Sequence, residues 1–323
     1  MTSYGFHDRL TEAFPSQVIV DATEVCNLAC IHCPHPGFKH SSHYAARYLP
    51  LELHHKMVDE VREHGQGACR YIRYTSNGEP LVHPKIYEML DYAVARSGVF
   101  VTLTTNGTIM NEKRIAKLLA SGLQMVDISL DALTPQTYAR VRVDGDLDVT
   151  QRNVHTLLRL KREVGAATRV VVSFVEQPQN AHEAAAFEAY WRNTAVDEVV
   201  MRRLHSAAGG VTRIAADMLT RQKKAQRYPC LYPWERISLN PRGDLAFCPQ
   251  DWVHGSVIAD FRTATIRDTW RGEAYRKLRA AHLANEFSGH GFCGQCPDWA
   301  QTRWPGEGRS YADLVADFRK AGG

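Results

Sequence analysis

The stretch QVIVDATEVCNLACIHCPH, residues 17–35, joins a short β-branched run to three closely spaced cysteines. The run at 17–22 predicts a buried β-strand. Cys26, Cys30 and Cys33 follow it at a C-x3-C-x2-C spacing, so the thiols come directly after the carboxyl end of that strand. Three thiols are one fewer than a closed tetrahedral metal site requires, which raises the question of what completes the set.

These thiols are compatible with two kinds of metal site. Thiolates are soft ligands that suit zinc, copper(I) and iron-sulfur clusters. Structural zinc takes four protein ligands, and His32 or His35 could complete such a set. An iron-sulfur cluster held by only three thiolates would instead leave one iron without a protein ligand, and that iron could bind a substrate or cofactor directly. The spacing alone leaves both sites open.

Six β-branched runs alternate with amphipathic segments over the first two thirds of the chain. The runs lie at 17–22, 71–76, 99–105, 125–130, 169–175 and 197–203. Segments between them, such as LELHHKMVDEVREHG (51–65), have apolar residues three and four apart, as expected for helices with one buried face. Strands followed by helices predict an α/β fold with a parallel sheet, either an open sheet or a partial barrel.

Polar clusters follow the first four predicted strands. The three-cysteine loop follows the first, SNGEP (76–80) the second, TNGT (105–108) the third and SLDA (129–132) the fourth. Ligands bind at the carboxyl ends of parallel strands in both open sheets and barrels. We therefore expect these clusters to face one common site.

The pattern changes after about residue 215. The stretch 229–252 predicts a hairpin whose turn lies at 240–244. A helical segment follows and leads to CGQC. Four of the remaining cysteines lie in this last third: Cys230, Cys248, Cys293 and Cys296. We therefore predict two domains, 1–215 and 216–323.

The composition is that of a folded protein with little net charge. Of its 323 residues, 44% are hydrophobic and 23% charged, and the formal net charge is +4, so nucleic-acid binding is not expected. Residues 1–14 carry Asp and Glu without an apolar core, and no window approaches about 18 uninterrupted apolar residues. We expect neither a signal peptide nor a membrane span, and hence a cytoplasmic protein. In that reducing compartment, clustered cysteines favour metal or catalytic sites over disulfides.

With this strand pattern, the C-x3-C-x2-C loop resembles that of the radical S-adenosylmethionine (radical SAM) superfamily. The resemblance implies a partial (β/α)6 TIM barrel in which Cys26, Cys30 and Cys33 bind a 4Fe-4S cluster whose open iron chelates S-adenosylmethionine (SAM). In that family, an external electron donor such as flavodoxin or ferredoxin reduces the cluster. Cleavage of SAM then gives methionine and a 5'-deoxyadenosyl radical that abstracts a substrate hydrogen.

The resemblance also implies SAM-binding roles at the strand ends. SNGEP is similar to the family's GGEP motif with its first glycine replaced; Gly78 would permit close backbone approach, and Glu79 could accept from the SAM ammonium group. His32 stands where the family commonly has an aromatic residue. The implied set is His32, Asn77, Gly78, Glu79, Pro80, Asn106, Ser129, Asp131 and Ser173. Such residues also suit ordinary strand-to-helix turns and helix caps.

The C-terminal cysteines resemble those of the SPASM or Twitch extensions of radical SAM enzymes. Full SPASM domains carry about seven cysteines and two auxiliary clusters in the family, whereas this region has four, enough for one fully ligated 4Fe-4S cluster. The resemblance thus implies two 4Fe-4S clusters in all, with Cys230, Cys248, Cys293 and Cys296 around the second. A four-cysteine zinc ribbon is the alternative.

The cysteine pattern is most similar to that of aminocyclitol dehydrogenases, 2-deoxy-scyllo-inosamine dehydrogenase among them. In that group an alcohol carbon becomes a ketone, and the substrate radical gives a proton to a base and an electron to the auxiliary cluster. A related amino-sugar epimerase would need a hydrogen donor, commonly a thiol. Cys69, the only cysteine outside the two sets, is expected in the core, and Pro249 follows Cys248, so dehydrogenation is favoured.

The base and the substrate are less well defined. Candidates for the base are Arg203, His205, Arg213 and Asp251, each of which could instead be a surface charge. We expect a small polar substrate, because the chain shows neither a further peptide-recognition module before residue 17 nor a second auxiliary set. Modification of a ribosomal peptide or of a sulfatase is a second class of function, and a zinc-stabilised binding protein is a third.

Overall fold

The computed structural model describes residues 13–222, 227–301 and 311–321. All six strands expected in the first two thirds are present: β1 (Gln17–Val20), β2 (Tyr71–Tyr74), β3 (Phe100–Thr105), β4 (Met125–Ser129), β5 (Arg169–Glu176) and β6 (Glu198–Arg203). Each pairs in parallel with the next, and the described strands form one unclosed sheet in the order β6-β5-β4-β3-β2-β1-β7-β8-β9. The predicted α/β fold with a partial barrel is therefore confirmed.

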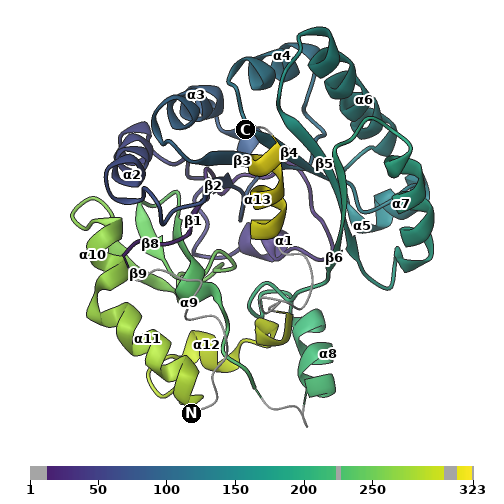
Figure 1. The fold of residues 1–323 in the computed structure, drawn as a ribbon. Coiled ribbons are helices and arrows are strands. Elements are labelled where there is room, and N and C mark those ends of the chain that lie inside the picture. Colours follow the sequence, from purple (N-terminus) through teal and green to yellow (C-terminus); the bar gives the residue numbers. More distant parts are fainter. Residues whose placement is uncertain (1–12, 223–226, 302–310, 322–323) are drawn as a thin grey trace.

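Helices cover the outer face of this sheet, as Figure 1 shows. They are α2 (Leu51–His64), α3 (Ile86–Arg96), α4 (Glu112–Ala120), α5 (Pro135–Val141), α6 (Leu147–Glu163) and α7 (Ala184–Arg192). Buried side chains of α2, α3, α4, α6 and α7 join those of the strands in one apolar core. Because alternate residues of a strand point to opposite faces, the other half of each strand lines the inner, concave face.

The predicted hairpin extends the same sheet. Strands β7 (Arg236–Leu239) and β8 (Asp244–Ala246) are antiparallel, and β9 (Val257–Asp260) follows β8. At the turn, the Asn240 side chain accepts hydrogen bonds from the backbone of Arg242 and Asp244. Strand β7 also pairs in parallel with β1, a pairing that the sequence did not predict. The C-terminal cysteine region is thus attached directly to the first strand of the barrel.

Short helices complete the C-terminal region. Those between β6 and β7 are α8 (Thr212–Gln222) and α9 (Tyr232–Glu235); those after β9 are α10 (Ile266–Arg271), α11 (Glu273–Ala284) and α12 (Gly291–Gln295). Helix α10 lies against α2 of the barrel, where the Glu60 carboxylate accepts from the backbone of Ile266.

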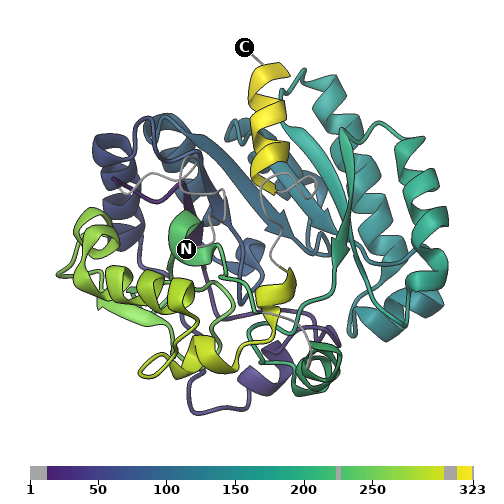
Figure 2. The same cartoon turned by 60° about the horizontal axis from the view of Figure 1, so that its bottom comes forward.

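The last helix, α13 (Tyr311–Ala321), lies against the concave face of the sheet (Figures 1 and 2). Leu314 and Val315 are buried there against Tyr71, Phe100, Met125 and Val171. Three of these four strand residues begin their strands, so α13 closes the amino end of the barrel. Cys69, just before β2, is buried near this end, as predicted, and its pKa is raised to about 12 by burial. The carboxyl ends of the strands form the opposite mouth.

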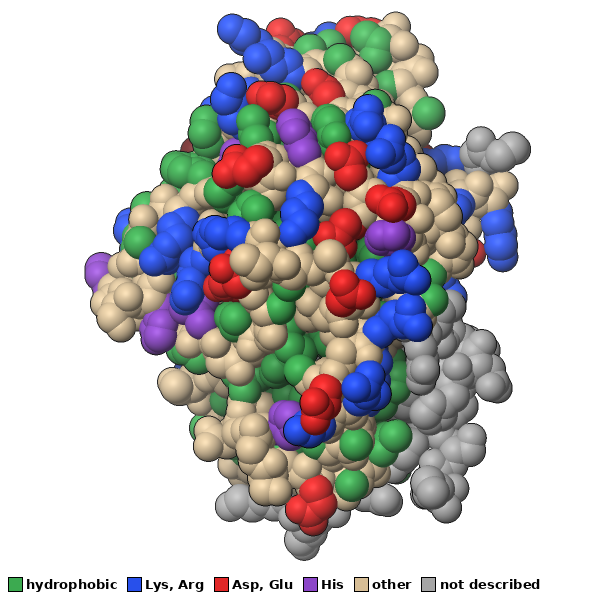
Figure 3. Space-filling model, turned by 90° about the vertical axis from the view of Figure 1, so that its left-hand side faces the viewer, with side chains coloured by type: hydrophobic (Ala, Val, Ile, Leu, Met, Phe, Trp, Pro, Cys, Tyr) green, Lys and Arg blue, Asp and Glu red, His purple; other side chains and the backbone are tan. Residues whose placement is uncertain are grey.

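The surface in Figure 3 carries Lys, Arg, Asp and Glu side chains interspersed, without a field of one sign on that face. No described helix is long and apolar enough to span a membrane. Most of the segment assessed for a signal peptide, residues 1–12, lies outside the described residues.

Candidate functional site

The three-cysteine loop leaves β1 at the mouth of the barrel and is fixed by backbone hydrogen bonds. The amides of Ala29 and Ile31 donate to the carbonyls of Val143 and Val141, at 3.0 and 3.1 Å. These carbonyls belong to the end of α5 and the connection that follows it. The loop therefore holds one conformation independently of its cysteine side chains.

The three thiols of this loop are close enough to influence one another electrostatically. Burial, followed by the nearby Glu79 carboxylate, raises the pKa of Cys26 to about 12. Burial also raises the pKa of Cys30 and Cys33, and the mutual influence of the thiols adds to the shift at Cys33. Metal ligation requires thiolates, and three thiolates at these positions need a strong positive charge among them. The donor set therefore fits an iron-sulfur cluster bound by three cysteines.

A buried arginine that the sequence did not single out lies beside these thiols. Arg142 Nε and Nη2 donate to Asp131 Oδ2 at 2.9 and 2.6 Å, and Arg142 Nη1 lies 3.8 Å from Cys30 Sγ. The pair is almost wholly buried. Burial lowers the pKa of Arg142, but Asp131, Cys30 and Tyr138 together outweigh this effect and raise the pKa, so Arg142 stays protonated. Asp131 also has a left-handed backbone, with φ of 61°. The Asp131 carboxylate thus compensates the Arg142 charge next to Cys30.

His32 is uncharged at neutral pH. Burial lowers its pKa to about 4, although Asp131 acts in the opposite direction. Gln177 Nε2 donates to His32 Nδ1 at 3.1 Å, so the neutral ring carries its proton on Nε2, which lies 3.6 Å from Asp131 Oδ2. His32 therefore contributes a neutral ring, in the position where the family commonly has an aromatic side chain.

The SNGEP segment lies between β2 and a short 3-10 helix, η2 (Pro80–Val82). Glu79 is buried and accepts three hydrogen bonds, from Leu81 N and Thr105 Oγ1 to Oε1 and from Asn106 N to Oε2, at 2.7–3.0 Å. Burial raises its pKa. A carboxylate has about four lone-pair sites, so one acceptor position remains for a ligand ammonium group.

Gly78 lies tightly against the loop that leads to the cysteines. A Cβ at this position would lie 2.0 Å from the Thr23 carbonyl oxygen and 2.7 Å from that of Val25. Gly78 therefore allows a close approach to the protein's own backbone at the start of the cysteine loop, whereas the approach to SAM that the resemblance implied stays a prediction.

We expect Gly78→Ala to lower the free energy of unfolding by about 3 kcal/mol, because two backbone carbonyls must move to admit the methyl group. Gly37→Ala is the matched control, since a Cβ there meets nothing within 4 Å. Thermal unfolding of the two variants and the unchanged protein tests this expectation. Equal stability of all three proteins would show that the backbone at Thr23 and Val25 moves to admit the methyl group at little cost in free energy.

The remaining strand-end residues lie at the same mouth. Asn106 Nδ2 donates to Asn27 Oδ1 of the cysteine loop at 2.9 Å, while Asn106 Oδ1 accepts from Thr108. Ser129 and Ser173 are register partners on β4 and β5, and Ser173 is buried. The residues that the resemblance implied for SAM binding thus lie in the cysteine loop or at the carboxyl ends of strands β2 to β5, and their role in SAM binding stays a prediction.

The four C-terminal cysteines converge in a second place. Cys230 precedes α9, Cys248 follows β8, Cys293 lies in α12 and Cys296 ends that helix. Burial raises the pKa of Cys293 and Cys296 to about 12, and the other thiols of the set add to the shifts. Burial and the same neighbours raise the pKa of Cys248. Four neighbouring thiols fit one fully ligated iron-sulfur cluster.

Two side-chain hydrogen bonds join the SNGEP segment to the loop after Cys248. Ser76 Oγ donates to the Pro249 carbonyl at 2.5 Å, and Asn77 Nδ2 donates to the Asp251 carbonyl at 3.1 Å. Ser76 has a φ of 121°, a conformation that costs a non-glycine residue about 1–3 kcal/mol and persists only where its surroundings enforce it. The two cysteine sets are therefore held in a fixed relation.

The four residues expected as candidate bases lie in different environments. Asp251 is buried and accepts four hydrogen bonds, all from residues 253–256 of its own loop. Arg203 is exposed. His205 Nδ1 accepts from Ala207 N at 3.2 Å, and burial lowers its pKa. Of the four, His205 is close enough to His32 to influence its pKa.

Arg202, rather than its neighbour Arg203, points to the concave face. Arg202 and Arg73 both contact Asp127 Oδ2, and Arg73 also donates to Thr104. These side chains come from four strands, so the inner wall below the mouth is polar and charged. Successive residues of a strand point to opposite faces, so residue 202 lies inside and residue 203 outside. A prediction from sequence that is displaced by one residue selects the wrong arginine.

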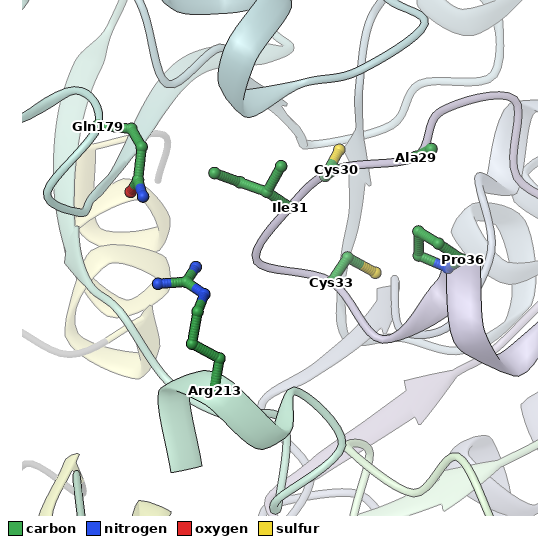
Figure 4. Close-up of a pocket in the computed structure, with 7 residues that line it drawn as sticks. All are labelled: Ala29, Cys30, Ile31, Cys33, Pro36, Gln179 and Arg213. Atoms are coloured by element: carbon green, nitrogen blue, oxygen red, sulfur yellow. The ribbon is translucent and has the colours of Figure 1, made fainter. Parts of the chain in front are cut away.

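An open hollow of about 600 Å³ lies against the outer side of the cysteine loop (Figure 4). Arg213, exposed at the start of α8, and Gln179 face Ile31 across it, whereas the Cys33 sulfur points toward Pro36. The hollow therefore borders the three-cysteine set, with Cys30 and Cys33 among its lining residues.

Two family models match the chain. That of the Radical SAM superfamily matches residues 20–187, and that of SPASM, an iron-sulfur cluster-binding domain, matches residues 230–297. Together these domains imply SAM and iron-sulfur clusters as cofactors.

Curated relatives resemble parts of the chain. An AdoMet-dependent heme synthase of Methanosarcina barkeri is 34% identical over 40% of this chain and 34% of its own length. The mycofactocin maturase MftC of Mycobacterium tuberculosis is 23% identical over 88% of this chain and 76% of its own length. The chain thus spans only about a third of the heme synthase.

Solved structures share the fold over nearly the whole chain. BtrN in complex with AdoMet and 2-DOIA has a TM-score of 0.58 and 15% identity, covering 87% of this chain and 92% of its own. Streptococcus suis SuiB bound to the precursor peptide SuiA has a TM-score of 0.62 and 14% identity, covering 94% and 73%.

Proposed function

Since the chain belongs to the radical SAM superfamily and carries a SPASM domain, we propose that it is a radical SAM dehydrogenase that oxidises an alcohol carbon of a small polar substrate, such as an aminocyclitol or amino sugar, to a ketone. It would hold two 4Fe-4S clusters, one at Cys26, Cys30 and Cys33 and one at the four C-terminal cysteines. The observation that carries the proposal is the fixed connection between a three-thiol set and a four-thiol set through Ser76 and Asn77.

When bound, the clusters and SAM supply one-electron chemistry whose net result is substrate plus SAM giving ketone, methionine, 5'-deoxyadenosine and one proton. One electron enters by way of an external donor such as flavodoxin or ferredoxin, and one leaves the substrate, so the electrons balance. The fourth thiolate is missing only from the set beside Glu79 and Arg142, and this is where a SAM-binding iron is expected.

The protein's residues would orient SAM and keep water away. Glu79 would offer its free acceptor position to the SAM ammonium group, and the neutral His32 ring would add no charge to the site. The polar wall formed by Arg73, Asp127 and Arg202 suits a hydroxylated or aminated substrate better than an apolar one. Of the candidate bases, His205 is the one whose charge acts on His32.

The thiol inventory favours oxidation over epimerisation. Seven of the eight cysteines belong to the two sets, and Cys69 is buried at the closed end of the barrel. The Cys69 thiol donates weakly to the Tyr71 carbonyl, at 3.7 Å. No cysteine is therefore left at the mouth to return a hydrogen atom to a substrate radical.

Peptide modification is the second candidate function. Its support is the likeness to SuiB, bound to a precursor peptide, and to the maturase MftC, both of which extend over most of this chain. The four C-terminal cysteines, enough for one auxiliary cluster, are our reason for preferring a small substrate.

We expect anaerobically reconstituted protein, supplied with SAM, dithionite and a panel of aminocyclitols and amino sugars, to give a product two hydrogens lighter than its substrate. Mass spectrometry of the product and the amount of 5'-deoxyadenosine formed provide the test. A product of unchanged mass but inverted configuration would identify an epimerase. Turnover of peptides alone would replace the proposed substrate class.

A further inference from the structure

Arg227 lies against the four-cysteine set and is held there by carbonyl groups. Its Nη1 donates to the Gly294 carbonyl at 2.9 Å and its Nη2 to the Cys293 carbonyl at 2.6 Å. The guanidinium carbon lies 4.0 Å from the centre of the Phe287 ring. Both carbonyls belong to α12, which carries Cys293, so the guanidinium is fixed relative to the cysteines.

The Nε–H of this arginine is a buried donor without a partner. Nε is shielded from solvent and makes no hydrogen bond, although the other two nitrogens of the group do. Buried donors in folded proteins are nearly always satisfied, and leaving one unmet costs about 1–3 kcal/mol. Thiol groups of the set act on the Arg227 charge. A sulfur atom of a bound cluster is therefore a fitting acceptor.

The two cysteine sets differ in how their neighbouring arginine is compensated. Arg142, beside Cys30, forms an ion pair with Asp131. Within the described ranges, no carboxylate lies within 4.0 Å of the Arg227 guanidinium nitrogens, and its polar partners are carbonyls. Asp298, which acts on Cys296, accepts hydrogen bonds from the 206–208 loop. Arg227 therefore acts on the four-cysteine set without an ion-pair partner of its own, while Asp298 acts on Cys296 in the opposite direction.

We propose that Arg227 donates its Nε–H to a sulfur of the four-cysteine iron-sulfur cluster and thereby raises the midpoint potential of that cluster. A nearby cation and a hydrogen bond to sulfur both favour the reduced, more negative state. Through this direct contact, Arg227 makes the four-cysteine cluster the better electron acceptor of the two. The inference rests on the proposed function in one respect only, namely that the electron accepted by this cluster comes from the substrate radical.

The test measures the potential directly and does not require a substrate. Full-length protein carrying Cys26→Ala, so that only the four-cysteine cluster is loaded, is titrated anaerobically with EPR detection of the reduced cluster. We expect Arg227→Met to lower the ratio of reduced to oxidised cluster at a fixed applied potential about tenfold, equivalent to about 59 mV for one electron. Arg227→Lys, which keeps the charge but loses Nε–H, should lie between. Arg221→Met, at an exposed residue paired with Asp217, is the control.

Unchanged potentials in both Arg227 variants would overturn the inference. If Arg227→Met retains too little iron to titrate, Arg227→Lys decides alone: an unaltered potential contradicts the hydrogen bond, and a lowered one supports it. A lowered potential in protein that oxidises no aminocyclitol would leave this inference standing and count only against the proposed substrate.

Discussion

Cys26→Ala is expected to reduce 5'-deoxyadenosine formation to the level of a protein-free control. Cys26, Cys30 and Cys33 are the only cysteines at the carboxyl ends of strands β1 to β6, and two thiolates do not hold a 4Fe-4S cluster in place of three. Loss of this cluster would remove the proposed site of SAM binding and reduction. Chromatography of the nucleoside after incubation with SAM and dithionite measures the effect.

The iron content of the same variant identifies which cluster is lost. Because the four C-terminal cysteines are untouched, roughly half of the iron should remain after anaerobic reconstitution. Cys69→Ala is the matched control, since this thiol lies at the closed end of the barrel and is buried away from both sets. It should retain full iron and full nucleoside formation. Zinc without iron-sulfur absorption in the unchanged protein would instead favour the zinc-stabilised binding protein.

The elements that could be predicted from the sequence are those encoded by local patterns. Six β-branched runs gave six parallel strands, because buried strands need apolar residues over a short stretch whatever their partners. The hairpin was equally local, since the Asn240 side chain closes its turn. The cysteine spacings, together with strand position, predicted two separate sets of thiols.

What could not be predicted depends on contacts between distant segments. Arg142 reaches Cys30 across 112 positions of sequence, and no local motif marks it. The pairing of β7 with β1 and the placement of α13 on the concave face likewise depend on tertiary packing. Asp251 illustrates the opposite difficulty, a candidate base whose side chain has a structural role. Its carboxylate accepts four hydrogen bonds within its own loop, and its position in the sequence did not reveal them.

The two arginines suggest how one chain can hold clusters with different tasks. The Arg142 charge is offset by Asp131, whereas Arg227 contacts carbonyl oxygens. Because Asp131 offsets the Arg142 charge, Arg142 would do little to stabilise the reduced state of the three-cysteine cluster. This suits the strong reductant that the proposed SAM cleavage needs. An uncompensated charge at the second set has the opposite effect, which suits electron acceptance.

Cys293→Ala is expected to spare SAM cleavage while blocking oxidation of the substrate. Cys293 is one of the four proposed C-terminal ligands. Among the described residues, α12, which carries it, makes no hydrogen bond to the three-cysteine loop. Removing it leaves that cluster with three ligands and alters its electron-accepting properties. The 5'-deoxyadenosine yield should stay within about twofold of the unchanged protein, while the ketone falls to background, because the substrate radical lacks its electron acceptor.

The ratio of 5'-deoxyadenosine to ketone therefore separates the roles of the two clusters. In the unchanged protein the two products should form in nearly equal amounts, and in Cys293→Ala the nucleoside should form almost alone. Gly291→Ala, in the same helix and with nothing within 4 Å of the added methyl group, is the control for local disturbance and should keep the unchanged ratio. Full turnover in Cys293→Ala would remove the auxiliary cluster from the mechanism. The four-thiol set would then serve to stabilise the C-terminal domain, since its position next to β7 and β8 requires no redox role.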